Sequence, residues 1–203
     1  MALSAQDKIL YVANKLGLST LNQMQGSTGA VYDVDTDVSG QIFSSATRHQ
    51  NPSVTNVTEN QFEVNEALLV ETISFFTRRA SDGAIQNFQN VYGAGAVIVF
   101  DLIIGNKRVM KDTPIFGGGM PFTFAHNAIV EQVIGETTVN SVLPRHQVFM
   151  EGAGVLIPPQ VQWYVEYRVF NMVTGATIPV VDTAQIGCYL YGTRVLLNFN
   201  TTI

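Results

Sequence analysis

The sequence predicts an all-β fold, an antiparallel β-sandwich preceded by a short helix. Three observations support this prediction. After Ala30, apolar and polar side chains alternate with a period of two, as they do in half-buried strands. Long irregular segments separate these stretches. The sequence does not show the regular strand–helix alternation that would indicate a parallel sheet. A chain of 203 residues can also bury one good core without disulfide bonds.

The first 28 residues differ from the remainder. Ser4 and Asp7 have the spacing of a capping box, and Gly17 is well placed to end a helix. Apolar residues recur between them at helical spacing, namely Ile9, Val12, Ala13 and Leu16. The small polar segment 19–29 then indicates a linker. We therefore expect an N-terminal helical arm and linker over 1–28 and a sandwich domain over 29–203.

A three-turn helix with one apolar stripe is marginal alone and must dock on something. One possibility is its own sandwich, and the other is a neighbouring subunit. The second possibility makes Ile9, Val12 and Leu16 candidate subunit contacts.

The strands are expected where the alternation is clearest. Gly105-Asn106 is a two-residue hairpin signal between two of them. Trp163 shares a strand face with Val165 and Tyr167, so it is expected in the core, and Cys188 lies in an apolar run as a small buried residue. The expected strands cover residues 31–38, 61–77, 91–104, 107–111, 122–133, 146–150, 161–170 and 185–199.

Charge is scarce in this chain. Only 13% of residues are charged, against about 25% in an average soluble domain. We infer that neighbouring subunits cover much of the surface, because so little charge protects poorly against association. The net charge of −5 argues against nucleic-acid binding. No apolar stretch is long enough for a membrane span, and the N-terminus lacks the pattern of a signal peptide.

Catalytic and metal-binding motifs are missing, so we expect no enzyme, no cofactor and no metal. The three histidines, His49, His126 and His146, are scattered, whereas cupin-type metal sites use two histidines one residue apart. A phosphate-binding loop, a nucleophile elbow and a zinc-binding helix motif are also missing.

Asp33, Asp35 and Asp37 resemble the opening of a calcium-binding loop. Val38 and Ser44 stand where the EF-hand pattern requires Gly and Glu. Strand alternation explains the triplet equally well as a solvated face, and the sequence leaves calcium binding open.

Two stretches carry a resemblance. They are residues 154–170, with an apolar strand, a Pro158-Pro159 step and a long amphipathic strand, and the closing strand over 187–197. Together with the hairpin signal, they resemble the jelly-roll capsid proteins of bacterial viruses. The resemblance implies a jelly-roll sandwich that packs in a shell, with its arm and loops reaching neighbours. It also implies copies of the chain and other virion proteins as partners, and a virion location after assembly in the host cytoplasm.

One departure concerns the arm. Many capsid arms that contact the genome are basic, whereas residues 1–28 contain only Lys8 and Lys15. We therefore expect no contact between this arm and nucleic acid.

Two other functions stay open. The chain could be a fibre, tail or adhesin module that recognises a glycan or a partner protein through exposed aromatics such as Tyr164, Tyr189 and Tyr191. It could also be a β-sandwich enzyme or metal protein whose scattered histidines converge in space.

Overall fold

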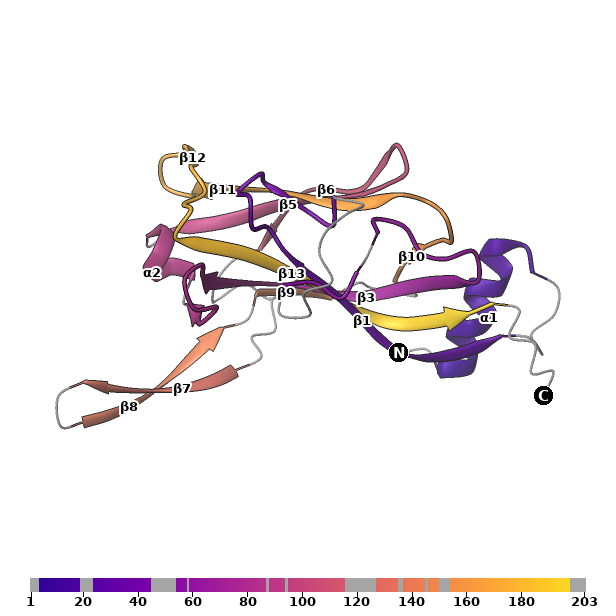
Figure 1. Cartoon of the computed structure of the whole chain (residues 1–203), viewed down its shortest axis with the longest axis horizontal. Helices are drawn as coiled ribbons and strands as arrows, with labels where there is room; N and C mark the ends of the chain where they lie inside the picture. Colours follow the sequence, from indigo (N-terminus) through magenta and orange to yellow (C-terminus); the bar gives the residue numbers. More distant parts are fainter. Residues whose placement is uncertain are drawn as a thin grey trace.

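The computed structural model is mostly antiparallel β-structure. Its described strands form two sheets that pack face to face, which confirms the predicted all-β sandwich (Figure 1). The structure describes residues 4–18, 24–44, 54–57, 59–86, 88–93, 95–115, 127–134, 137–144, 146–149 and 154–197.

Sheet A, the first of the two, has the strand order β1-β13-β3-β10. These strands are β1 (Gln25–Val34), β13 (Ala184–Leu196), β3 (Glu66–Arg79) and β10 (Val155–Ile157). The long strand β3 also pairs with β9 (His146–Phe149) and β4 (Ile85–Gln86). Its register with β13 shifts between Tyr191 and Gly192.

Sheet B has the strand order β12-β11-β5-β6, and β2 also pairs with β11. Its strands are β2 (Gln41–Ile42), β5 (Ala96–Ile104), β6 (Lys107–Ile115), β11 (Trp163–Asn171) and β12 (Thr177–Ile178). The predicted turn at Gly105-Asn106 joins β5 to β6, and Gly105 has the positive φ of 61° that such a turn favours.

Two further elements lie outside these sheets. The short helix α2 (Phe88–Tyr92) precedes β5. The strands β7 (Asn127–Ile134) and β8 (Thr137–Pro144) pair with each other and with no other described strand. They form a hairpin that extends away from the sandwich (Figure 1). None of the described helices is long and apolar enough to cross a membrane.

The core lies between the inner faces of the sheets. Trp163 is fully buried there, as predicted, with its ring centroid 4.6 Å from that of Phe43 and 5.5 Å from that of Phe62. Cys188 is also buried in this cluster, as the sequence indicated. The alternation along β11 is regular because Trp163, Val165 and Tyr167 face inwards.

The N-terminal helix α1 (Ala5–Leu16) has the predicted capping box at Ser4 and Asp7, and it ends at Gly17 in the left-handed conformation. It docks on its own sandwich rather than standing apart. Val12 is fully buried in a second apolar cluster on the outer face of sheet A. That cluster also contains Ala67 and Leu69 of β3, Val195 of β13, and Leu197, which follows the end of β13.

Residues 25–29 of the expected linker are strand in the structure. Strand β1 begins at Gln25 and pairs with β13 from that residue onwards, so the predicted domain boundary at residue 28 falls inside a strand. The small residues of this segment fit β1 because Gly26 lies against the Ile9 side chain, where a β-carbon would overlap it. Helix α1 therefore packs against strand β1 of its own sandwich.

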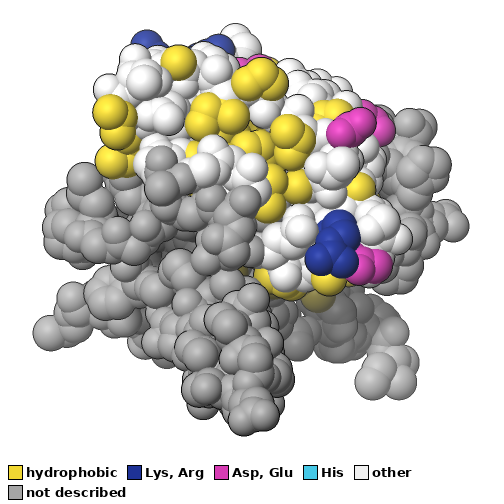
Figure 2. All heavy atoms as spheres, turned by 90° about the vertical axis from the view of Figure 1, so that its left-hand side faces the viewer, with side chains coloured by type: hydrophobic (Ala, Val, Ile, Leu, Met, Phe, Trp, Pro, Cys, Tyr) yellow, Lys and Arg dark blue, Asp and Glu magenta, His cyan; other side chains and the backbone are white. Residues whose placement is uncertain are grey.

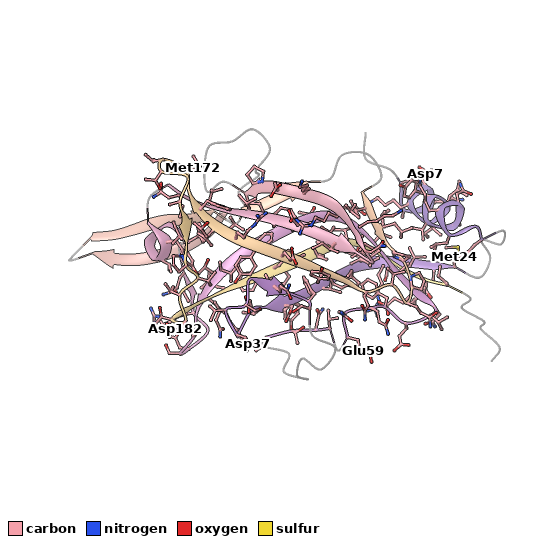
Figure 3. The ribbon with its side chains drawn as sticks, turned by 90° about the horizontal axis from the view of Figure 1, so that it is seen from above. Asp7, Met24, Asp37, Glu59, Met172 and Asp182 are labelled. Atoms are coloured by element: carbon pink, nitrogen blue, oxygen red, sulfur yellow. The ribbon has the colours of Figure 1, made fainter. Side chains whose placement is uncertain are left out.

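The sandwich is elongated, and its connections gather at two ends. The β3–β5 connection and the β11–β13 connection lie at one end, with Met172 and Asp182, which we call the loop end. Asp7 and Met24 lie at the opposite end, together with α1 (Figure 3).

The acidic triplet is not a solvated face. Asp33 and Asp35 are buried, and only Asp37 is exposed. The Asp35 carboxylate accepts hydrogen bonds from the Gly40 N–H at 2.7 Å and from the Tyr167 hydroxyl at 2.8 Å. It also accepts from the N–H groups of Asp37 and Ser39, so it organises the β1–β2 connection and ties it to sheet B. The predicted common solvated face of the three acids is therefore wrong, because β1 ends at Val34 and only Asp37 is exposed.

Candidate functional site

The outer face of sheet A carries a group of aromatic side chains that we call the aromatic patch: Tyr32, Phe76, Tyr189 and Tyr191. Tyr189 is its centre, with ring centroids 5.3 Å from Tyr32 and 5.2 Å from Phe76. Alternation along β13 sends Cys188 and Leu190 into the core and the two tyrosines outwards. Tyr189 and Tyr191 remain 39% and 50% exposed.

Small residues lie beside and beneath this patch. The Phe76 ring lies directly over Gly187, where any β-carbon would overlap it. Ser74 is the cross-strand partner of Tyr189, and Thr72 is the partner of Tyr191. Rings of this kind offer apolar surface with a polar hydroxyl, which suits a partially wet interface. The patch shares its sheet face with α1, which covers the opposite half of that face.

A second apolar surface lies at the loop end. Val173 is 87% exposed, Ile85 is 57% exposed and Met172 is 56% exposed. The exposed Pro179 and the half-buried Val180 and Val181 follow in the β12–β13 connection. Figure 2 shows hydrophobic side chains gathered over this end with few charged ones beside them. We call Ile85, Met172, Val173 and Pro179 the apolar end.

The outer face of sheet B is different because it carries charge. Arg108 contacts the buried Asp101 carboxylate at 2.7 Å and Glu166 at 3.4 Å. Arg168 contacts Asp112 at 2.6 Å. The charges in each pair neutralise each other. The exposed Arg168–Asp112 pair adds little stability.

The described residues do not bring metal-ligating or catalytic groups together. No group of three His, Cys, Asp or Glu side chains in the described ranges is placed to hold a metal ion. Burial raises the pKa of the Cys188 thiol well above its usual value, and the nearby Asp33 charge adds to the rise. A protonated, buried thiol is a poor nucleophile. His49 and His126, like the side chain of His146, lie outside the described residues.

The predicted contact residues lie on one helix face but differ in exposure. Val12 is buried against its own sandwich, while Ile9 and Leu16 are half-buried beside it. Of the three named tyrosines, the structure brings Tyr189 and Tyr191 together. Tyr164 lies apart from them, on the outer face of sheet B.

Sequence reasoning missed the apolar end and the part that Tyr32 and Phe76 play in the aromatic patch. The alternation of β1 and β13 could have placed Tyr32 outwards, but pairing it with Tyr189 required the register. Met172 and Val173 precede the Thr174-Gly175 turn, and nothing in the sequence marks them as exposed.

Comparison with known proteins found no match for the chain among family models, curated proteins or solved structures.

Proposed function

We propose that this chain is a structural virion protein, a self-assembling capsid or capsid-associated subunit of a bacterial virus. The observation that carries the proposal is the strand order of the two sheets. Antiparallel pairs nest within one another along the chain: β1 with β13, β2 with β11, β3 with β9 and β10, and β5 with β6. The sequence resemblance to jelly-roll capsid proteins supports the same function.

Nested pairing of this kind is what a long hairpin produces when it is rolled into two sheets. Rolling then places β13 beside β3 and β11 beside β5, as observed. A jelly roll has this arrangement, and the fold serves viral capsids, lectins and cupins. This fold is compatible with a shell subunit but also with other functions. The exposed surfaces of the subunit help to distinguish these functions.

The surfaces favour association. The aromatic patch and the apolar end expose large apolar groups on a chain in which only 13% of residues are charged. Exposed apolar patches with few surrounding charges mark contacts with other proteins. Two such surfaces on different sides let one subunit contact more than one neighbour, which a closed shell requires.

Several basic side chains in the described ranges pair with carboxylates, which argues against a genome-binding surface. Lys8 pairs with Glu71 at 2.8 Å, and Arg194 pairs with Glu66 at 2.6 Å. Arg108 and Arg168 also face carboxylates on sheet B. Binding to phosphates would require releasing these groups from their partners. We therefore propose contacts with copies of itself and other virion proteins in the particle, and none with nucleic acid.

Electron microscopy and light scattering of the purified chain test this function. We expect particles or large closed oligomers. Val173→Lys at the apolar end should weaken assembly because it brings a charge into a contact. Val109→Lys is the matched control, since Val109 is an exposed valine of β6 that belongs neither to the aromatic patch nor to the apolar end. A chain that stays monomeric at every concentration would contradict the proposal.

A second candidate is a fibre, tail or adhesin module that binds a glycan. The observation that favours it is the pair of exposed tyrosines, Tyr189 and Tyr191, on one flat sheet face. Glycan binding that is lost in Tyr191→Ala, together with the absence of particles from the parent protein, would favour this second function.

A further inference from the structure

The four outer edges of the two sheets are protected to very different degrees. An edge strand exposes unpaired backbone groups, and proteins normally block such edges with short strands, lysine, proline or bulges. Beyond β3, sheet A ends in the short strands β4, β9 and β10. Beyond β11, sheet B ends in β2 and β12, which have two residues each.

The long edge strand β6 is blocked in every one of the other ways. It contains Lys107, Lys111 and Pro114, and its register with β5 is irregular. Asp112 has a φ of 47°, a left-handed conformation that bends the strand.

Strand β1 has none of these devices. It is ten residues long, and from Gln25 to Tyr32 it contains no charged residue and no proline. Ser27, Thr28 and Ala30 are exposed. Its other edge is fully paired with β13 without a register shift, so the strand is regular. Among the four outer edges of the two sheets, β1 is therefore the long edge that is suited to pairing.

The hydrogen bonds of β1 identify which backbone groups face this edge. Asn56 donates its side-chain amide to the Ala30 carbonyl at 2.8 Å, and its side-chain oxygen accepts from the Tyr32 N–H at 2.7 Å. In an antiparallel strand, the N–H and C=O groups of one residue point to the same neighbouring strand. The backbone groups of the even-numbered residues of β1 therefore point to the open edge.

Asn56 imitates a paired strand at the end of this edge. Towards the start of β1, the N–H and C=O groups of Gly26 and Thr28 and the N–H of Ala30 have no partner among the described segments.

We propose that the β1 edge over residues 26–30 pairs, antiparallel, with the same segment of a second copy of this chain. The edge-facing residues 26 and 30 lie symmetrically about Thr28. A two-fold axis there places Gly26 of one copy opposite Ala30 of the other, so each N–H faces a carbonyl. The Ala30 carbonyl, which accepts from Asn56, would accept the Gly26 N–H through its second lone pair. Without charges on the segment, two identical edges approach without repulsion. This pairing rests on the proposed function, since it makes one contact of the assembling subunit and joins sheet A of two copies into one continuous sheet.

Thr28→Pro tests the proposal. The Thr28 N–H faces the open edge, so proline removes a donor to the second copy but none of the bonds to β13. Thr28→Val is the matched control because it keeps the N–H and suits a strand. Losing one donor on each side should raise the dissociation constant of the dimer by roughly tenfold or more, whereas Thr28→Val should leave it unchanged. Sedimentation over a concentration series measures this, and circular dichroism confirms the fold.

Hydrogen exchange on the parent protein and a second variant keep the proposal falsifiable if Thr28→Pro misfolds. The Thr28 and Ala30 amides should be protected only at concentrations where copies associate. Thr28→Lys should weaken association while leaving the monomer folded. Protection of these amides in the dilute monomer would mean that the chain covers its own edge, and equal association of parent and Thr28→Lys would overturn the pairing. Particles that still form in Thr28→Lys would refute the pairing alone, whereas a parent that dimerises without forming particles would refute only the shell.

Discussion

Removing the Asp35 side chain tests how much the buried carboxylate contributes to the fold. In Asp35→Ala, the Gly40 N–H and the Tyr167 hydroxyl both lose this acceptor, and the Tyr167 side chain is almost fully buried. A buried donor that loses its acceptor costs about 1–3 kcal/mol, and the half-buried Gly40 N–H should add less, so Asp35→Ala should cost roughly 2–4 kcal/mol. The N–H groups of Asp37 and Ser39 lie in an exposed connection and can turn to water. They should add little.

The assay is urea unfolding followed by tryptophan fluorescence, with the midpoint and slope fitted for each variant. A typical domain has a free energy of unfolding of about 5–15 kcal/mol, so the expected loss is a large fraction of the total. Tyr167→Phe removes one donor and leaves the carboxylate bound by the β1–β2 connection, so it should cost about 1 kcal/mol. Asp37→Ala is the exposed control and should change stability by less than about 1 kcal/mol. If Asp35→Ala unfolds at the same urea concentration as Asp37→Ala, the carboxylate does not hold the connection to sheet B.

Three further predictions concern the core, the arm and the thiol. Trp163→Ala should lower the free energy of unfolding by about 3–5 kcal/mol, because it empties a fully buried ring site. Since Trp163 is the single tryptophan of the chain, its urea unfolding is followed by circular dichroism. Val12→Asp should undock α1 and make it sensitive to protease, whereas Leu10→Asp, on the exposed side of the helix, should not. Cys188 should react with a thiol reagent only after unfolding. Because its pKa is raised in the folded state, stability should fall as the pH rises above the ordinary thiol pKa of about 8.5.

Each outcome has a clear contrary result. A Trp163→Ala variant that melts like the parent would place the ring outside the core. Equal protease sensitivity of Val12→Asp and Leu10→Asp would mean that the docking of α1 does not depend on the Val12 side chain. Rapid labelling of Cys188 in the folded protein would show that the thiol is accessible.

Local patterns were enough to predict α1 and the long strands β3, β5, β6, β11 and β13. The period of two along β11 identified its inward residues, including Trp163, because strand geometry alone decides which side chains share a face. The cap of α1 and the β5–β6 turn were predicted because both depend on residues only a few positions apart. Long-range consequences were less accessible. Asp33 and Asp35 were expected in solvent, since nothing local indicates that the Tyr167 hydroxyl bonds to Asp35.

The sequence by itself determined that the chain is an antiparallel β-sandwich, poor in charge, with a capped helix at its start. These properties follow from composition and from contacts between near neighbours. Only the tertiary structure decided that α1 covers part of sheet A, that Tyr189 joins Tyr32 and Phe76, and that β1 presents a long uncharged edge. The physical reason is that each of these features depends on strand order and register. Those are set by packing between residues far apart in the chain, so alternation can assign a face but not the neighbour across it.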